Sequence, residues 1–587
     1  MEEFTNFRAL TAQIGSYDFP MLMFLLKAIF VLFIIISIVL LIYDRFIQRE
    51  NQLLINHPLI GRLRYFFYAL RDPMRQYFGD EKFYESFDKV KWVLNSSERK
   101  SPYASFSPEQ PQKSARLSIK NANCVLNTED VSDVYRVTFG EDMKKPFTTN
   151  SVFGRSAMSD GAISPEGTRA FSKGAYLGNF PINTGEGSLT SNFLFTHKYK
   201  RENDKYLDTY EGTIFAKTIY KIMKFFFHQA GAESVYRDLV IDAADAESYL
   251  FDCDSLVCYR INWKAPLEDF PKEVPEDIPD IIFQIGSGLY GVRDSDGSFD
   301  EQRYKKTMCF AKMTEIKMAQ GAKQTGGKLL GSKVSEAIAY YRGVEPHKDL
   351  FSPNQFPFAH NLEELFDFIG RLKKLSDKPV GVKIVISSRE GFSEYANLIK
   401  KRIDAGSSAY PDFITVDGGD GGSGAAPLEM MMTVGMIIAK ALYIADTTLK
   451  KVGVRDKVKI IASEKVLTPD DAIVLFGIGA DYVAIARAFM MSAGCIRARE
   501  CSGANGRSCP VGLATQDKSK RASFLVEKKA QNVASYHGQL LFGVRNLLAI
   551  MGLKNIKELN KSHLLFKDHT GKTYMNVDHY FEASVVD

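Results

Sequence analysis

From residue 145 onward, short apolar runs alternate with longer stretches in which apolar residues recur at helical spacing. Runs of strand length lie at 280–288, 379–387, 412–419, 458–463 and 481–489. Helical stretches lie between them, at 361–375, 393–406, 428–452 and 468–479. The last of these has Thr468 as a candidate N-cap and Pro469 as its first helical residue. Strands that are apolar on both faces and are separated by helices form parallel sheets.

The alternation therefore predicts an α/β fold, a (β/α)8 TIM barrel over residues 145–550 with its site at the carboxyl ends of the strands. An open, doubly wound sheet is the alternative. It is disfavoured because the chain has no G-x-G-x-x-G turn followed by an acidic residue.

An apolar run near the N-terminus predicts one transmembrane helix. Residues 21–43 contain Lys27 as their only charge, and a helix of this length spans the hydrocarbon core of about 30 Å. A cleaved signal peptide is the alternative, but the run is long, Glu2 and Glu3 precede it and no small-residue cleavage site follows. Basic residues are more frequent after the run than before it: Arg45, Arg49, Arg62 and Arg64 against Arg8. The positive-inside rule then predicts a single-pass membrane protein whose C-terminal part is cytoplasmic.

The remaining segments complete the predicted organisation. Residues 1–20 form an N-terminal tail, 44–144 a linker and small, mostly helical region, and 551–587 a C-terminal extension. Within the linker, 64–80 is predicted to be helical before Pro73 and again up to Gly79, and the Pro- and Ser-rich stretch 96–116 is predicted to be a loop.

Composition excludes some classes of function. The net charge of this 587-residue chain is only +5, so nothing indicates a nucleic-acid partner. Four of the seven cysteines are scattered and form no pattern typical of a secreted disulfide framework, which favours a reducing compartment.

The other three cysteines are clustered. Cys495, Cys501 and Cys509 follow the spacing C-x5-C-x7-C. Three thiolates can hold an iron–sulfur cluster, and an odd number cannot all pair as disulfides. The spacing lacks the C-x2-C of common zinc sites. Three reduced structural thiols are the alternative.

A glycine-rich loop follows the predicted strand 412–419. The sequence DGGDGGSGAAP (417–427) has five glycines in its first eight residues. Glycine lets backbone N–H groups approach an anion closely, and a hydroxyl can add a donor. The loop is a candidate phosphate site, completed by Arg487 after a later strand, for flavin mononucleotide (FMN) or a nucleotide substrate; a tight structural turn is the alternative. The candidate residues are Asp417, Gly418, Gly419, Gly421, Gly422, Ser423, Gly424 and Arg487.

Several long motifs, in order, resemble the FMN-binding synthase domain of glutamate synthases. They are SAMSDGAISPEGTRAFSKGAYLGNFPINTGEGS (156–188), QIGSGLYGV (284–292), EIKMAQGAKQTGGKLLGSKVSEAIAYYRGV (315–344), the glycine-rich loop and the cysteine segment 494–516. The resemblance implies a barrel enzyme that reduces 2-iminoglutarate, formed from 2-oxoglutarate and ammonia, to glutamate. It implies FMN and a [3Fe–4S] cluster as cofactors, the cluster being held by the three clustered cysteines.

The resemblance also assigns roles to single residues. It places the flavin against the turn at Ala157, Met158 and Ser159, and Lys383 is a candidate cation at the pyrimidine end of the ring. It assigns the substrate carboxylates to Gln320, Lys323 and Arg342, with Lys323 and Glu186 as catalytic residues. From the residues alone, Lys383 has a structural alternative as the partner of a core carboxylate, and Glu186 as a turn carboxylate.

The chain departs from the family pattern at four places. The second cysteine gap is three residues longer than usual, Leu289 replaces a basic residue, Ser463–Lys465 lack the usual Gly-Gly, and the AQGAK loop is one residue shorter. No amidotransferase domain and no Rossmann signature for NAD(P)H or FAD is found, so ammonia and electrons are expected from partners, a ferredoxin or an NAD(P)H-oxidising subunit. The other candidate functions are a related amino-group transfer of the N-methylglutamate synthase type, and a non-catalytic membrane-anchored electron relay or assembly protein. A barrel of the IMP dehydrogenase kind would not need three clustered cysteines.

Overall fold

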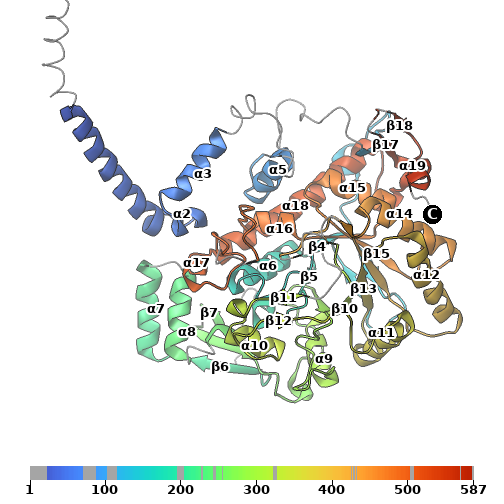
Figure 1. Ribbon diagram of the computed structural model, residues 1–587, viewed down its shortest axis with the longest axis horizontal. Coiled ribbons are helices and arrows are strands. Elements are labelled where there is room, and N and C mark those ends of the chain that lie inside the picture. The colour runs from blue at the N-terminus through green and yellow to red at the C-terminus, as the bar shows by residue number, and fades with distance from the viewer. Residues whose placement is uncertain are drawn as a thin grey trace, which may run out of the picture. The chain divides into compact units, whose positions relative to one another are not determined.

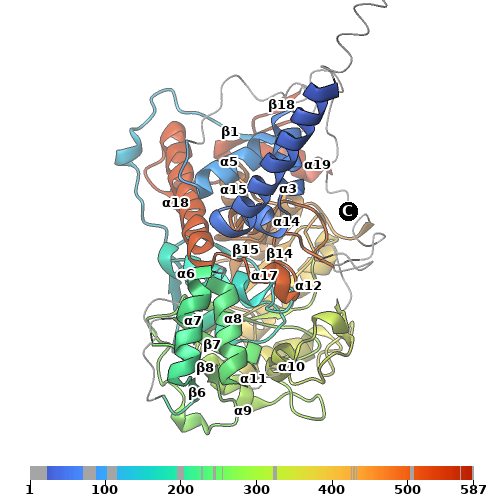
Figure 2. The same cartoon turned by 90° about the vertical axis from the view of Figure 1, so that its left-hand side faces the viewer.

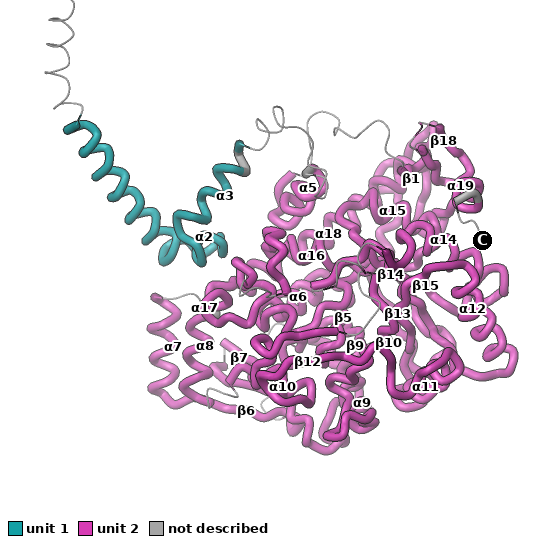
Figure 3. Tube along the Cα trace, in the orientation of Figure 1, with its two compact units in different colours: residues 1–82 teal, residues 83–587 magenta. Residues whose placement is uncertain are grey.

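The computed structural model describes residues 23–70, 87–101, 116–194, 204–226, 229–241, 246–253, 255–321, 327–424, 426, 430, 433–502, 508–568, 570 and 572–584. The chain divides into two compact units, residues 1–82 and 83–587 (Figure 3). The predicted boundaries at 145 and 550 fall inside the second unit and stay a prediction.

The first unit contains a helix, Met23–Ile47, that is long and apolar enough to cross a membrane. A signal sequence would pass the same test of length and composition, and the predicted cytoplasmic orientation stays a prediction. Two short helices follow, α2 (Gln52–Asn56) and α3 (Ile60–Ala69). Arg62 of α3 forms a bidentate ion pair with the buried Asp44, with N–O distances of 2.6 and 2.8 Å, and this pair ties α3 to the long helix.

The second unit is built on a closed barrel of eight parallel strands, which confirms the predicted fold class (Figure 1). Around the barrel, the strands follow one another in chain order. They are β4 (Phe153–Arg155), β5 (Ile182–Asn183), β9 (Ile281–Ile285), β10 (Ala311–Lys317), β13 (Val380–Ile384), β14 (Phe413–Asp417), β15 (Lys459–Ser463) and β16 (Tyr482–Ile485). Strands β9, β13 and β14 are buried at every position, as their continuous apolar sequences predict.

Helices follow the strands and cover the barrel. They are α6 (Pro165–Gly178), α9 (Glu301–Met308), α11 (Leu362–Ser376), α12 (Arg389–Asp404), α14 (Ile438–Lys451), α15 (Pro469–Ile478) and α16 (Arg487–Ser492). Thr468 is the N-cap of α15 and Pro469 stands in its first turn, as predicted. Asp471 completes a capping box with Thr468. The longer α18 (Val526–Met551) packs against α6, α15 and α5 (Phe87–Ser97).

Two predicted elements differ in the structure. The sequence predicts a helix over 428–452, whereas the long helix in this region, α14, begins at Ile438. Gly435 has a φ of +84°, and the backbone of Met436 bonds to Gly419 and Ile386, which breaks helical bonding there. The strand predicted over 481–489 ends at Ile485, and Arg487 begins α16. The predicted loop 96–116 and helix 64–80 lie largely outside the described residues.

An insertion between β5 and β9 forms a small layer beside the barrel. It consists of the helices α7 (Ile214–Phe226) and α8 (Gln229–Val240) and the antiparallel strands β6 (Leu207–Glu211), β7 (Leu250–Asp252) and β8 (Val257–Ile261). The two helices lie side by side in both views of the ribbon (Figures 1 and 2).

Short strands close the ends of the second unit. Strand β1 (Arg116–Ile119) pairs with β17 (Leu564–Lys567), which pairs with β18 (Thr573–Tyr574) before α19 (Val577–Ser584). Two hairpin-like pairs join β2 (Val137–Phe139) to β3 (Phe147–Thr149) and β11 (Lys328–Leu329) to β12 (Leu350–Phe351). The segments before and after the barrel are therefore joined by a common sheet.

Candidate functional site

Charged side chains gather at the carboxyl ends of the barrel strands. Lys317 is the last residue of β10, and its Nζ donates to Glu186 Oε2 at 2.7 Å. Glu186 follows β5, and Gly286 after β9 leaves room for it: a Cβ at Gly286 would lie 2.8 Å from Glu186 Oε2. Both side chains keep partial exposure, 14% for Lys317 and 25% for Glu186. The ion pair therefore lies at the rim of the barrel, where a ligand can reach it.

A second pair is sealed one strand further along. Lys383 is aligned with Lys317 across the β10–β13 pairing, and its Nζ lies 3.3 Å from Asp417 Oδ1. Both side chains are buried. The pairing of Lys383 with a core carboxylate is the structural alternative that the sequence left open.

The loop after β10 crosses the glycine-rich loop after β14. The N–H of Gly321 donates to Asp417 Oδ2 at 2.7 Å, and Gln320 Nε2 donates to the carbonyl of Gly422 at 2.7 Å. A Cβ at Gly321 would lie 1.7 Å from the carbonyl oxygen of Gly418, so only glycine fits this crossing. The structure thus brings together two motifs that are about a hundred residues apart. Lys323 lies outside the described residues.

Three backbone amides of the glycine-rich loop have partners within the chain, and the phosphate site predicted for this loop stays a prediction. The N–H groups of Gly418, Gly419 and Gly421 donate to the carbonyls of Ser463, Met436 and Gly418. These three amides are engaged within the chain and are not directed at an anion. Nearby, Glu464 accepts from the N–H of Ile438 at 2.8 Å, and burial raises the pKa of Glu464 to about 7.

Arg487 lies beside the outer half of this loop, whereas Lys383 pairs with Asp417 at its start. A Cβ at Gly422 would lie 3.6 Å from Arg487 Nη2, which places the guanidinium beside the outer half of the loop. Burial lowers the pKa of Arg487; Cys495 opposes this change, and the nearby Arg499 and Arg497 add to it. Three guanidinium groups that repel one another are stabilised by an anion. Gly422 and Gly424 are exposed, Ser423 is partly exposed, and a Cβ at Gly424 would meet no atom within 4 Å.

Arg342 ends α10 (Glu336–Arg342) and is buried against the rim. Its Nη2 donates to the carbonyl of Asp160 at 3.1 Å, its guanidinium lies 5.4 Å from the centre of the Tyr290 ring, and its Nε has no hydrogen-bond partner among the described residues. Burial lowers the pKa of Arg342, while Tyr290, Glu186 and Asp160 favour its charged form. A buried guanidinium donor without a partner matches what a carboxylate ligand needs.

The turn at Ala157, Met158 and Ser159 follows β4 and is partly exposed. Gly185 after β5 has a φ of +65°, and a Cβ there would lie 2.7 Å from the backbone nitrogen of Ser159. Arg155 Nη1 donates to the carbonyl of Met158 at 2.9 Å. The turn is thus held in place by its neighbours and keeps partial exposure.

Sequence reasoning missed Lys317 and Glu315. Lys317 lies in the motif 315–344 and ends the strand β10. Its position at the carboxyl end of a strand is the signal that could have identified it as a site residue. Glu315 lies inside the barrel, where it accepts from Asn183 Nδ2 at 2.8 Å, from Gln284 Nε2 at 2.6 Å and from Thr415. These partners come from three other strands, so only barrel closure brings them together.

The three clustered cysteines are described, and their side chains are half-buried or buried. Among the residues that the structure describes, no group of three or more His, Cys, Asp and Glu side chains is arranged to hold a metal ion. Burial raises the pKa of Cys495 to about 11, and the nearby Cys501 and Cys509 contribute in the same direction. Lys333 Nζ donates to the carbonyl of Cys501 at 2.6 Å.

Comparison with known proteins identifies the class. A family model described as a conserved region in glutamate synthase matches residues 87–554. The chain therefore belongs to the glutamate synthase family, and membership supports an oxidoreductase of glutamate synthesis at the family level.

Individual relatives agree with this assignment. The chain is 30% identical over 582 residues to the glutamate synthase large subunit-like protein YerD of Bacillus subtilis (strain 168), covering 92% of this chain and 94% of that protein. It is 31% identical over 292 residues to the archaeal-type glutamate synthase (NADPH) of Thermotoga sp. (strain RQ2), covering 49% of this chain and 53% of that one. The match thus spans about half the length of the second relative.

A solved structure, the flavin-binding domain of baker's yeast flavocytochrome b2, is similar with a TM-score of 0.37 at 10% identity, covering 86% of this chain and 82% of that chain.

Proposed function

We propose that this chain is an FMN-dependent oxidoreductase that forms glutamate from 2-oxoglutarate and ammonia, with electrons and ammonia delivered by partners. The observation that carries the proposal is the rim itself. It gathers Glu186 after β5, Lys317 at the end of β10 and the orphaned donor of Arg342 in the connection that follows β10. A dicarboxylate substrate needs cations in a partly open pocket, and a proton donor or acceptor beside its reacting carbon.

The residues fit FMN as a bound group. The turn 157–159 offers a backbone wall, Lys383 a buried cation, and Arg487 a guanidinium beside Gly422. Because three amides of the glycine-rich loop are engaged within the chain, we assign the FMN phosphate to Arg487 and the outer half of the loop, residues 422–424. When bound, FMN supplies the electron pair that converts the imine to the amine.

The roles of the chain's own residues follow from their chemistry. Arg342 holds one substrate carboxylate through its planar fork, and Lys323 and Gln320 are assigned to the other. Glu186, held by Lys317, is placed to carry a proton to or from the nitrogen as ammonia adds to the carbonyl and water leaves. The electron donor is proposed to be a ferredoxin or an NAD(P)H-oxidising subunit.

We further propose that Cys495, Cys501 and Cys509 hold one [3Fe–4S] cluster, as the family resemblance implies. Support comes from the spacing of three cysteines within fifteen residues and from the membership of the family. Changing any one of them to Ser is expected to remove the iron and the broad visible absorbance of anaerobically purified protein, with Cys309→Ser as the matched control. Iron-free protein with three reactive thiols would contradict the cluster and leave the flavin proposal standing.

The flavin site is tested by a pair of glycine variants. Gly321→Ala places a methyl group against the Gly418 carbonyl and forces the two loops apart, whereas Gly538→Ala on α18 meets no atom. We expect FMN content per chain, measured by absorbance of the released flavin, to fall about tenfold or more in the first variant and to stay unchanged in the second. Equal FMN content in both would place the flavin elsewhere.

The product is tested directly. Chemically reduced protein is mixed with 2-oxoglutarate and ammonium, and glutamate is measured by mass spectrometry while flavin reoxidation is followed. Glutamate formed in proportion to reoxidised flavin supports the enzyme. Reoxidation by an electron acceptor without glutamate supports the relay function instead.

A further inference from the structure

The outer face of α7 exposes large apolar side chains in the insertion beside the barrel. Ile214 is 85% exposed and Phe225 75%, and Phe215, Ile222 and Phe226 are also exposed. An exposed patch of this kind on a stable fold marks an interaction surface.

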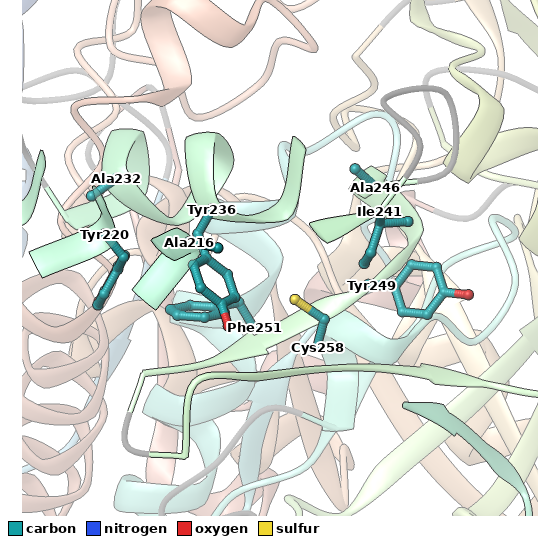
Figure 4. Close-up of a cluster of buried hydrophobic side chains, with 9 residues drawn as sticks. All are labelled: Ala216, Tyr220, Ala232, Tyr236, Ile241, Ala246, Tyr249, Phe251 and Cys258. Atoms are coloured by element: carbon teal, nitrogen blue, oxygen red, sulfur yellow. The ribbon is translucent and has the colours of Figure 1, made fainter. Parts of the chain in front are cut away.

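The inner face of α7 is fixed by a core of its own. Ala216 and Tyr220 are buried with Tyr236 of α8 and with Phe251 and Cys258 of the small sheet (Figure 4). The Tyr220 ring makes an edge contact with Phe251 at 5.0 Å between centroids. Because this face is held in the core, the apolar residues on the opposite face cannot rotate inward. Their exposure is a property of the fold.

The charges on α7 are all of one sign. Residues 214–226 contain Lys217, Lys221 and Lys224 and no Asp or Glu. At about 100° per residue, the five exposed apolar side chains occupy one arc of the helix and the three lysines border it on one side. Lys217 pairs with Glu211, and Lys221 and Lys224 are exposed. Aromatic and aliphatic residues bordered by lysines are typical of helices that lie in a membrane interface.

Helix α3 in the first unit repeats this composition independently. It exposes Ile60, Leu63, Phe66 and Phe67, carries Arg62 and Arg64 and has no acidic residue. It follows the apolar helix Met23–Ile47, none of which is buried over its most apolar window. Two helices in separate units thus share one chemistry, in a chain that carries its own candidate membrane span.

We propose that α7 is an interfacial helix that lies in the headgroup region of a bilayer containing anionic lipids and seats the barrel on the membrane. The proposal rests on the proposed transmembrane helix, which keeps the second unit within reach of the surface. The uniformly basic border complements anionic headgroups, and Phe and Ile enter the acyl boundary. A second copy of the chain or a partner protein is the competing occupant.

The test places a reporter on α7 of the full chain in vesicles. Phe225→Trp is compared with Phe351→Trp, an equally drastic change at an exposed position on β12. The protein is reconstituted into vesicles of phosphatidylcholine and phosphatidylserine with or without bromine on the acyl chains, and the signal of the native Trp92 and Trp263 is subtracted from unmodified protein. We expect brominated lipid to quench the indole introduced at position 225 about twofold or more, and the indole introduced at position 351 not at all.

A charge variant separates lipid from protein partners. Lys221→Glu combined with Lys224→Glu is expected to reduce quenching at position 225 severalfold in anionic vesicles. If the chain stays with the vesicles at high pH but brominated lipid does not quench the indole at position 225, the proposal for α7 is overturned and the transmembrane helix is not. In that case a change of oligomeric state in Ile222→Asp would assign the face to a second copy. If the chain leaves the vesicles at high pH, both the transmembrane helix and the proposal for α7 are overturned. This result would say nothing about the flavin site.

Discussion

The second unit contains two clusters of paired basic and acidic side chains that differ in their exposure to solvent. At the rim, Lys317 and Glu186 are paired but partly exposed. On α6, Arg169 and Glu166 lie in a cluster that is almost completely sealed, with side-chain exposures of 1% and 3%. The sealed cluster joins α6 to α8 through Arg169 and Glu233 at 3.0 Å. It joins the short helix α17 (Lys518–Arg521) to the insertion through Arg521 and Glu247 at 2.8 Å.

The difference separates structure from function. Burial opposes the charged form of Glu166, but Arg521, Arg169 and Arg237 lower its pKa below the ordinary value. Each charge in the sealed cluster is thus offset by neighbouring charges. The cluster therefore holds the insertion and the helix α17 against α6. At the rim, Arg342 Nε has no hydrogen-bond partner among the described residues, and Lys317 and Glu186 keep partial exposure, so we propose that these charges meet a ligand.

The largest expected effect is on the sealed cluster. Arg169→Met leaves Glu166 and Glu233 buried with one cation fewer, and we expect a loss of about 3–5 kcal/mol of unfolding free energy. The urea midpoint of the detergent-purified chain measures it. Lys400→Ala, which removes an exposed pair with Asp404, is the control and should cost no more than about 0.5 kcal/mol. Equal midpoints for the two variants would mean that the sealed cluster does not hold the fold.

An intermediate effect is expected at the rim. Arg342→Ala should weaken 2-oxoglutarate binding about 10- to 150-fold, since a charge-assisted hydrogen bond to a buried group contributes about 1.5–3 kcal/mol. Titration followed through flavin absorbance measures it. Arg342→Lys keeps the charge but not the planar fork and should recover only part of the affinity. Unchanged binding in Arg342→Ala, with Arg371→Ala as an exposed control, would remove this residue from the substrate site.

The smallest expected effect is a pH dependence at Glu464. Its pKa is raised by burial from 4.5 to about 7, so the folded state holds a proton that the unfolded state releases. Stability should therefore fall as pH rises from about 4.5 to about 7 and level off above. We expect a loss of about 1–2 kcal/mol for this partly exposed group. Glu464→Gln should abolish that slope in urea midpoints measured from pH 5 to 8, while Glu394→Gln on the exposed face of α12 should not. A slope that persists in Glu464→Gln would assign it to another group.

The sequence by itself determined the order of strands and helices in the barrel from α11 onward. Strands β9, β13, β14 and β15 lie within the predicted apolar runs, and the cap at Thr468 stands where predicted. These features are local, because a buried strand needs apolar residues on both faces and an N-cap needs a side chain at one position. The family motifs likewise lie at strand ends, where the barrel places its site.

Only the tertiary structure decided which partners the backbone amides and the charged side chains have. The amides of Gly418 and Gly419 bond to Ser463 and Met436, and Lys317 rather than a residue of the predicted set holds Glu186. The same reason explains the late start of α14 and the carboxylate of Glu315 at the centre of the barrel. Hydrogen bonds between segments about 20 to 130 residues apart form only when the eight strands close, and no local pattern records which donor meets which acceptor.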